Sequence, residues 1–181
     1  MDGLPQGGVV LITGIMAAGK STVAQALAER LPKAAHVRGD AFRRMIVSGR
    51  AEMVPGAGEE ALAQLRLRYR LSAATADAYA EEGFTAVVQD VVLGPELGAY
   101  TRLVRTRPFY VVVLAPDPVA VAAREAARGK TGYGDGWTPE LLDRGLREET
   151  DRIGLWLDTS ELTVDGTVEA ILAQLDEARV A

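Results

Sequence analysis

Residues 14–21 read Gly-Ile-Met-Ala-Ala-Gly-Lys-Ser and fit the phosphate-loop pattern G-x-x-x-x-G-K-[ST] without a gap. Glycines let the backbone curl so that successive N–H groups point at phosphate oxygens. In this pattern Lys20 places a positive charge on the β- and γ-phosphates, and the Ser21 hydroxyl ligates Mg²⁺. The alternative is a chance glycine turn before a helix. We expect ATP and Mg²⁺ to be held by Gly14, Ala17, Ala18, Gly19, Lys20, Ser21 and Thr22.

Two aspartates follow predicted strands. Asp40 comes after the second strand, and Asp90 ends the third. Reactive groups collect at the carboxyl ends of strands in open parallel sheets. We predict that Asp40 is the general base that takes the proton of an attacking hydroxyl, and that Asp90 joins Ser21 in holding Mg²⁺. The alternatives are a helix N-cap for Asp40 and an ordinary turn residue for Asp90.

Arg124 and Arg128 lie one helical turn apart, just before a segment rich in glycine. We predict that both are catalytic and stabilise the charge on the γ-phosphoryl group as it moves. The alternative is a solvated helix face on which they pair with Glu125. Residues 129–139 hold four glycines and no apolar period, which predicts a lid over the nucleotide.

The remaining basic residues carry weaker signals. Arg66, Arg68 and Arg70 alternate along a predicted helix, so only Arg66 and Arg70 share a face, and a solvated face is expected. His36 is the only histidine and is expected to have a surface or packing role.

The elements that must position these residues alternate between strands and helices. Apolar runs predict strands at 8–13, 35–37, 85–88, 109–114 and 155–157. Helical spacing and caps predict helices at 21–31, 42–47, 59–82, 94–104, 117–128, 139–152 and 168–178. This alternation predicts an α/β fold, a five-stranded parallel sheet with helices on both faces, formed by residues 1–181 as one domain.

Composition excludes several other classes. The net charge of −5 and the pI of about 5.0 argue against a nucleic-acid coat. The chain has no cysteine, which excludes disulfides, and its single histidine excludes a zinc site built on several histidines. The longest apolar runs are too short for a membrane span. We expect a soluble, cytoplasmic protein, and infer no membrane association and no obligate protein partner.

The chain resembles the small P-loop kinases, and among them the chloramphenicol phosphotransferase-like family. The likeness rests on the phosphate loop, on Arg38-Gly39-Asp40, on residues 89–94 (Gln-Asp-Val-Val-Leu-Gly) and on residues 124–129 (Arg-Glu-Ala-Ala-Arg-Gly). It implies a P-loop NTPase fold like that of nucleoside and shikimate kinases. It also implies that Asp40 is the base and that Arg124 and Arg128 act beside the phosphates. Gln89 stands where that family's pattern has an acid, and residues 42–69 do not resemble its substrate-binding stretch.

The leading hypothesis is a kinase that moves the γ-phosphoryl group of ATP to a hydroxyl of a small molecule, either antibiotic-like or a metabolite. One alternative is a nucleotide-dependent switch that hydrolyses ATP slowly and acts through a partner. Another is a polynucleotide 5′-hydroxyl kinase, which needs a basic channel such as a patch around Arg43, Arg44 and Arg50. The sequence names neither the acceptor nor the oligomeric state, and it leaves the choice of ATP or GTP open.

Overall fold

A computed structural model describes residues 6–127, 133 and 136–180, and the statements below concern these residues. Five parallel strands form the sheet in the order β2-β3-β1-β4-β5. They are β1 (Val9–Gly14), β2 (Ala34–Arg38), β3 (Thr85–Gln89), β4 (Phe109–Leu114) and β5 (Leu155–Leu157). β1, β3 and β4 are buried along their whole length, as expected for strands covered on both faces. The predicted fold class is confirmed.

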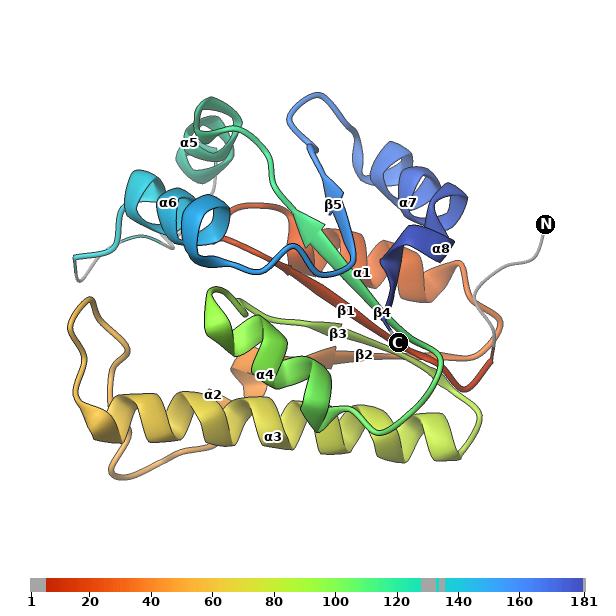
Figure 1. Ribbon diagram of the computed structural model, residues 1–181, viewed down its shortest axis with the longest axis horizontal. Helices are drawn as coiled ribbons and strands as arrows, with labels where there is room; N and C mark the ends of the chain where they lie inside the picture. The colour runs from red at the N-terminus through yellow and green to blue at the C-terminus, as the bar shows by residue number, and fades with distance from the viewer. Residues whose placement is uncertain (1–5, 128–132, 134–135, 181) are drawn as a thin grey trace.

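Helices cover both faces of this sheet (Figure 1). α3 (Glu59–Glu81) packs on α4 (Pro95–Leu103) on one side, and α1 (Lys20–Glu29) packs on α7 (Val164–Ala173) on the other. α5 (Pro118–Ala126) and α6 (Pro139–Glu149) lie together beyond the carboxyl end of β4. The short α2 (Gly39–Arg44) follows β2 directly and packs on α3. No helix among the described residues is long and apolar enough to cross a membrane.

The end of the chain differs from its prediction. Instead of one helix over 168–178, α7 begins at Val164 and ends at Ala173, and α8 (Leu175–Ala178) and a sixth strand, β6 (Arg179–Val180), follow. The earlier start has a local cause, because the Thr163 side chain caps α7 by accepting a hydrogen bond from the Gly166 N–H. β6 pairs antiparallel with the start of β4.

Other helix boundaries also differ, including that of α1, which ends at Glu29 rather than at Leu31. The helix expected at 42–47 is α2, which begins three residues earlier, at Gly39. Asp40 therefore lies inside a helix rather than at the end of β2. The helix expected at 139–152 ends at Glu149.

The long α3 is tied to the loop before β4 through a buried carboxylate. Asp77 accepts hydrogen bonds from the backbone N–H groups of Arg105 and Thr106 and from the Thr106 hydroxyl. Burial raises the pKa of Asp77, but these hydrogen bonds outweigh burial and hold the pKa below its usual value. This contact fixes α3 against the sheet, and α3 carries one of the residues of the site described next.

Candidate active site

The phosphate loop joins β1 to α1, as its sequence predicts, and its backbone requires small residues. Gly14 ends β1 with φ +146°, and a Cβ there would lie 2.5 Å from the Leu114 carbonyl oxygen. Ala17 and Gly19 have φ values of +62° and +93°, in the left-handed region. These conformations turn the chain back on itself between the strand and the helix.

The inside of this loop is suited to an anion. Lys20 is buried, and its Nζ donates to the Ile15 carbonyl oxygen at 2.7 Å. Among the described residues, α1 has no side-chain cap at Gly19, and its first turn holds no acidic residue. The first N–H groups and the positive end of the helix dipole are therefore left for an anionic ligand. The residues present fit a polyphosphate.

Ser21 is held by a residue at the end of β3. Its hydroxyl donates to Gln89 Oε1 at 2.8 Å. Gln89 entered the sequence analysis only as a departure from a family pattern, and its place directly before Asp90 at a strand end is the signal that marks it as a site residue. No group of three or more histidine and acidic side chains within the described parts of the chain is placed to hold a metal. A Mg²⁺ ion here would therefore have phosphate oxygens as well as protein groups among its ligands.

Asp90 is buried and faces α3 rather than Ser21. Both of its carboxylate oxygens accept hydrogen bonds from the guanidinium of Arg68, with 2.8 Å between Arg68 Nε and Asp90 Oδ2. The reading of Asp90 as an ordinary turn residue is therefore wrong. Its magnesium role stays a prediction, and direct ligation would require the pair with Arg68 to open.

Arg68 is a site residue that the sequence analysis placed on a solvated face. Burial lowers the pKa of its guanidinium, and the negative charge of nearby Asp40 opposes that effect. The spacing of Leu65, Arg68 and Ser72 by three and four residues is the signal that would have placed Arg68 on the covered face of α3.

Asp40 lies in the first turn of α2 with its side chain 41% exposed. Its Oδ2 accepts a hydrogen bond from Arg44 Nε at 2.6 Å. The N-cap alternative is wrong, because the N-cap of α2 is Arg38. The preceding residue packs on the buried ion pair, since a Cβ on Gly39 would lie 1.9 Å from Asp90 Oδ2. Asp40 is thus an accessible carboxylate on a helix whose start is fixed by Asp90.

Arg124 contacts the phosphate loop from the side of β5. Its guanidinium donates to the Ala18 carbonyl oxygen at 3.4 Å and to the Thr159 carbonyl oxygen at 2.5 Å. Arg124 therefore points toward the loop rather than into solvent. Arg128 and residues 129–132 and 134–135 of the predicted lid lie outside the described residues.

Two residues of the predicted lid segment that are described make defined contacts. The Tyr133 hydroxyl donates to the Met16 carbonyl oxygen in the phosphate loop at 2.7 Å. Trp137 Nε1 donates to the Met53 carbonyl oxygen at 2.8 Å. The segment thus contacts both the phosphate loop and the connection between α2 and α3.

Residues 9–146 of the sequence match a protein family described as the AAA domain. This chain belongs to that AAA domain family. No curated protein matches the sequence. The chloramphenicol phosphotransferase-like resemblance is not confirmed at the level of that family, whereas the kinase-like P-loop fold is.

Solved structures, several of them kinases, share the fold of this chain. A sugar kinase from Janibacter sp. HTCC2649 is 19% identical with a TM-score of 0.65, and 96% of each chain is covered. The APS kinase of Mycobacterium tuberculosis in complex with AMPPNP and APS is 18% identical with a TM-score of 0.66, covering 95% of this chain and 99% of that one. The Deinococcus radiodurans tunicamycin resistance protein is 16% identical with a TM-score of 0.64, covering 96% and 98%.

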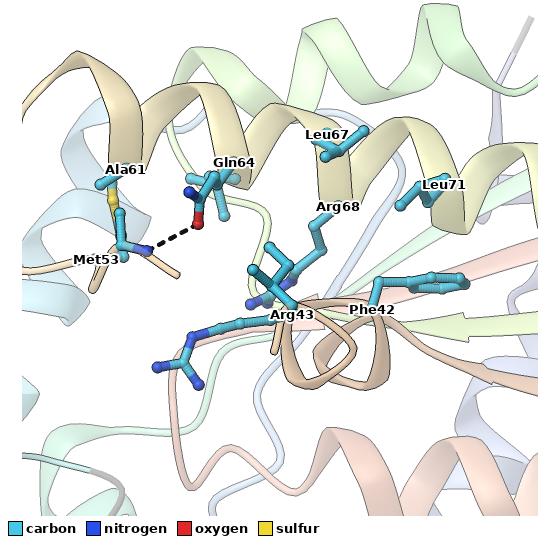
Figure 2. Close-up of a pocket in the computed structure, with 11 residues that line it drawn as sticks. Phe42, Arg43, Met53, Ala61, Gln64, Leu67, Arg68 and Leu71 are labelled. Carbon is cyan, nitrogen blue, oxygen red and sulfur yellow. Dashed lines mark hydrogen bonds between the residues drawn. The ribbon is translucent and has the colours of Figure 1, made fainter. Parts of the chain in front are cut away.

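A pocket of the AAA domain lies between α2, α3 and the connection that joins them (Figure 2). Its volume is about 50 Å³, room for one or two water molecules. Arg68 reaches it from α3, and Phe42 and Arg43 reach it from α2, the helix that carries Asp40. The sequence analysis did not foresee this pocket. Its lining is completed by Ile46, Ala51, Met53, Ala61, Gln64, Leu65, Leu67 and Leu71.

Proposed function

We propose that this AAA domain is an ATP-dependent kinase that transfers the γ-phosphoryl group to a hydroxyl of a small molecule, either antibiotic-like or a metabolite. The observation that carries the proposal is the placement of Asp40. The carboxylate is 41% exposed and lies on α2, the helix that borders a separate pocket. A protein that only binds or hydrolyses nucleotide needs neither this carboxylate nor a second pocket.

In the proposed reaction, the acceptor oxygen forms a bond to the γ-phosphorus. The bond between that phosphorus and the bridging oxygen breaks, and its electron pair leaves with ADP. The hydroxyl proton passes to the Asp40 carboxylate, which later releases it to solvent. Lys20 and Arg124, which both contact carbonyl oxygens of the phosphate loop, would balance charge on the phosphates, with Arg128 as a further predicted cation.

Mg²⁺, when bound, would neutralise phosphate charge and hold the phosphate oxygens in place. The Ser21 hydroxyl would be one ligand from the protein, and the Asp90 carboxylate is the predicted second ligand. The Ser21 hydroxyl hydrogen is donated to Gln89, which would leave the lone pairs of the hydroxyl oxygen for ligation.

A specific observation weakens the polynucleotide kinase alternative. Of the three arginines of the suggested basic patch, Arg43 and Arg50 pair with Glu52, and Arg44 pairs with Asp40. A groove for a nucleic-acid strand needs cations that are free to meet phosphates. Within the described parts of the chain, these three do not form such a groove.

The experiment that tests the proposal is a transfer screen with γ-labelled ATP and Mg²⁺ over antibiotics, nucleosides, sugars and oligonucleotide 5′ ends. We expect one acceptor class to gain the mass of one phosphoryl group while ADP forms in equal amount. ADP formation that no acceptor accelerates would contradict a kinase and favour a slow nucleotide switch. Transfer confined to oligonucleotides would favour the polynucleotide kinase.

A further inference from the structure

We infer that the acceptor is a neutral molecule with a large apolar part, such as an aryl alcohol, rather than an anionic metabolite or a polyol. This inference rests on the proposed function and names the substrate class of the pocket between α2 and α3. It is carried by two independent observations, the apolar lining of the pocket and the pairing of its polar groups.

Apolar side chains make up most of the pocket wall, and several are open to solvent. Leu67 and Leu71 project from α3 toward the pocket (Figure 2) and are 36% and 41% exposed. Met45 and Val47, which flank the lining residue Ile46 in the sequence, are 68% and 97% exposed. Covering apolar surface contributes roughly 25 cal/mol per Å², so an apolar ligand is the partner that this wall favours.

The two arginines of the pocket already have their counter-charges. Arg43 is paired with Glu52, and Arg68 is paired with the buried Asp90. A carboxylate, sulfate or phosphate on the acceptor would have to break one of these pairs and leave Glu52 or Asp90 without its cation. Among the residues that the structure describes, the pocket wall therefore offers no uncompensated positive charge to an anionic acceptor.

The amide of Gln64, also in the wall, is engaged as well. Its Oε1 accepts from the Ala51 N–H at 2.9 Å (Figure 2), and its Nε2 donates to the Gly49 carbonyl oxygen at 2.8 Å and to Glu60 Oε1 at 2.7 Å. An acceptor with many hydroxyls would lose its water partners and gain few hydrogen bonds in return. The wall thus disfavours polyols as well as anions, because its polar groups already have partners within the protein.

The pocket is too small for such an acceptor, so part of its wall has to move when the acceptor binds. Sites for small molecules occupy roughly 300–1,000 Å³, and this pocket has about 50 Å³. Its outer wall is the connection between α2 and α3, held by the bonds from Ala51 to Gln64 and from Trp137 to Met53. The inference therefore requires this connection to move outward when an acceptor binds, because the other walls of the pocket belong to α2 and α3.

The test compares acceptors that differ in one property. 3-Phenyl-1,2-propanediol and 3-phenyllactate share an aryl group and a hydroxyl but differ in charge, and glycerol keeps the diol without the ring. Binding is measured by ligand-observed NMR without nucleotide, and transfer by mass with ATP and Mg²⁺. We expect the aryl diol to bind at least about tenfold more tightly than either other compound and to be phosphorylated in preference.

A matched pair of variants locates the binding. Leu71→Gln places an amide in the pocket wall, whereas Leu141→Gln makes the same change on α6, at a leucine of similar exposure, 39% against 41%, that does not line the pocket. Leu71→Gln should weaken diol binding about fivefold or more, Leu141→Gln should leave it unchanged, and thermal melts should confirm that both fold.

The outcomes separate the two proposals. Preferred binding and phosphorylation of 3-phenyllactate or glycerol would overturn the inference and leave the kinase function standing. Equal diol binding by Leu71→Gln and wild type would also overturn it. Diol binding that depends on Leu71, with no transfer to any acceptor, would support the apolar pocket and contradict the kinase.

Discussion

The Ser21 hydroxyl donates a 2.8 Å hydrogen bond to Gln89 Oε1, linking the start of α1 to the end of β3. This bond fixes the side-chain rotamer of the phosphate-loop residue that is predicted to ligate Mg²⁺. A neutral amide holds Ser21 without adding a negative charge beside the phosphates. The departure from the resembled family's pattern at residue 89 therefore falls on the partner of the predicted metal ligand, not on a remote position.

Gln89→Ala should raise the Mg²⁺ concentration needed for half-maximal turnover by about tenfold, because a residue that orients a metal ligand typically contributes 10–100-fold to metal affinity. The measurement is a Mg²⁺ titration of ATP turnover at saturating nucleotide. Gln174→Ala, which removes an amide that donates to the Ala170 carbonyl oxygen of α7, is the matched control. An unchanged Mg²⁺ requirement in Gln89→Ala would mean that Gln89 does not position the metal ligand.

Lys20→Ala should slow turnover, because it removes a cation fixed inside the phosphate loop. The loss should be several kcal/mol of transition-state stabilisation. Lys33→Ala is the control, since Lys33 bonds to the Glu82 carbonyl oxygen away from the loop. Turnover and thermal melts are compared for both variants. Wild-type turnover in Lys20→Ala would remove the phosphate-loop assignment.

Gly39→Ala should lower the free energy of unfolding by roughly 1–3 kcal/mol and slow turnover. The new Cβ would overlap the Asp90 carboxylate, which Arg68 holds in place, so the start of α2 and Asp40 must shift. Gly145→Ala is the contrasting change inside α6, because no described residue beyond the glycine's chain neighbours and the backbone of α6 itself lies within 4 Å of its Cβ position. It should stabilise the protein by about 0.5–1 kcal/mol. Urea unfolding measures both, and a neutral Gly39→Ala would contradict the close packing of Gly39 on Asp90.

His36 gives the protein a defined sensitivity to acid. Burial, with the nearby charge of Arg38, lowers the pKa of His36 from 6.5 to about 4. Its Nδ1 lies 2.8 Å from Gln25 Oε1, while Nε2 is buried without a hydrogen-bond partner among the described residues. The unfolded chain therefore takes up the proton first as the pH falls.

Stability from neutral His36 should be fully present above pH 6.5 and decline as the pH falls from there to about 4. Discounted for the half-exposed ring, the loss should reach about 1 kcal/mol relative to His36→Gln, which does not titrate. Urea unfolding of both proteins at neutral and mildly acidic pH measures it. Parallel pH profiles would mean that His36 does not titrate differently in the folded state.

Local patterns carried most of the fold prediction. The phosphate loop, its strand and its helix were predictable because one short segment specifies the backbone conformation. The buried strands were predictable because each is a continuous apolar run. β6 was missed because a two-residue edge strand forms only through pairing with Phe109 and Tyr110, a contact between distant parts of the chain.

The site was harder to predict, since its partners come together only in three dimensions. The position of Asp40 on the chain was clear, but not its place inside α2. The pairing of Arg68 with Asp90 joins α3 to the end of β3 across 22 residues. The alternation of arginines along the helix suggested that Arg66 and Arg70 share a face. The structure instead covers Arg68, which lies between them in the sequence.

The central claim is that Asp40 takes the proton of a bound hydroxyl during phosphoryl transfer. Its most direct test is single-turnover transfer by Asp40→Asn, with nucleotide titration alongside, using the acceptor found in the screen. Asp165→Asn is the control, because Asp165 also lies in the first turn of a helix and pairs with an arginine, Arg30. The account predicts a fall of roughly 10²–10⁴-fold in transfer with little change in ATP affinity, nearer the low end because a loose transition state needs less help from a base. Transfer by Asp40→Asn at the wild-type rate would contradict it.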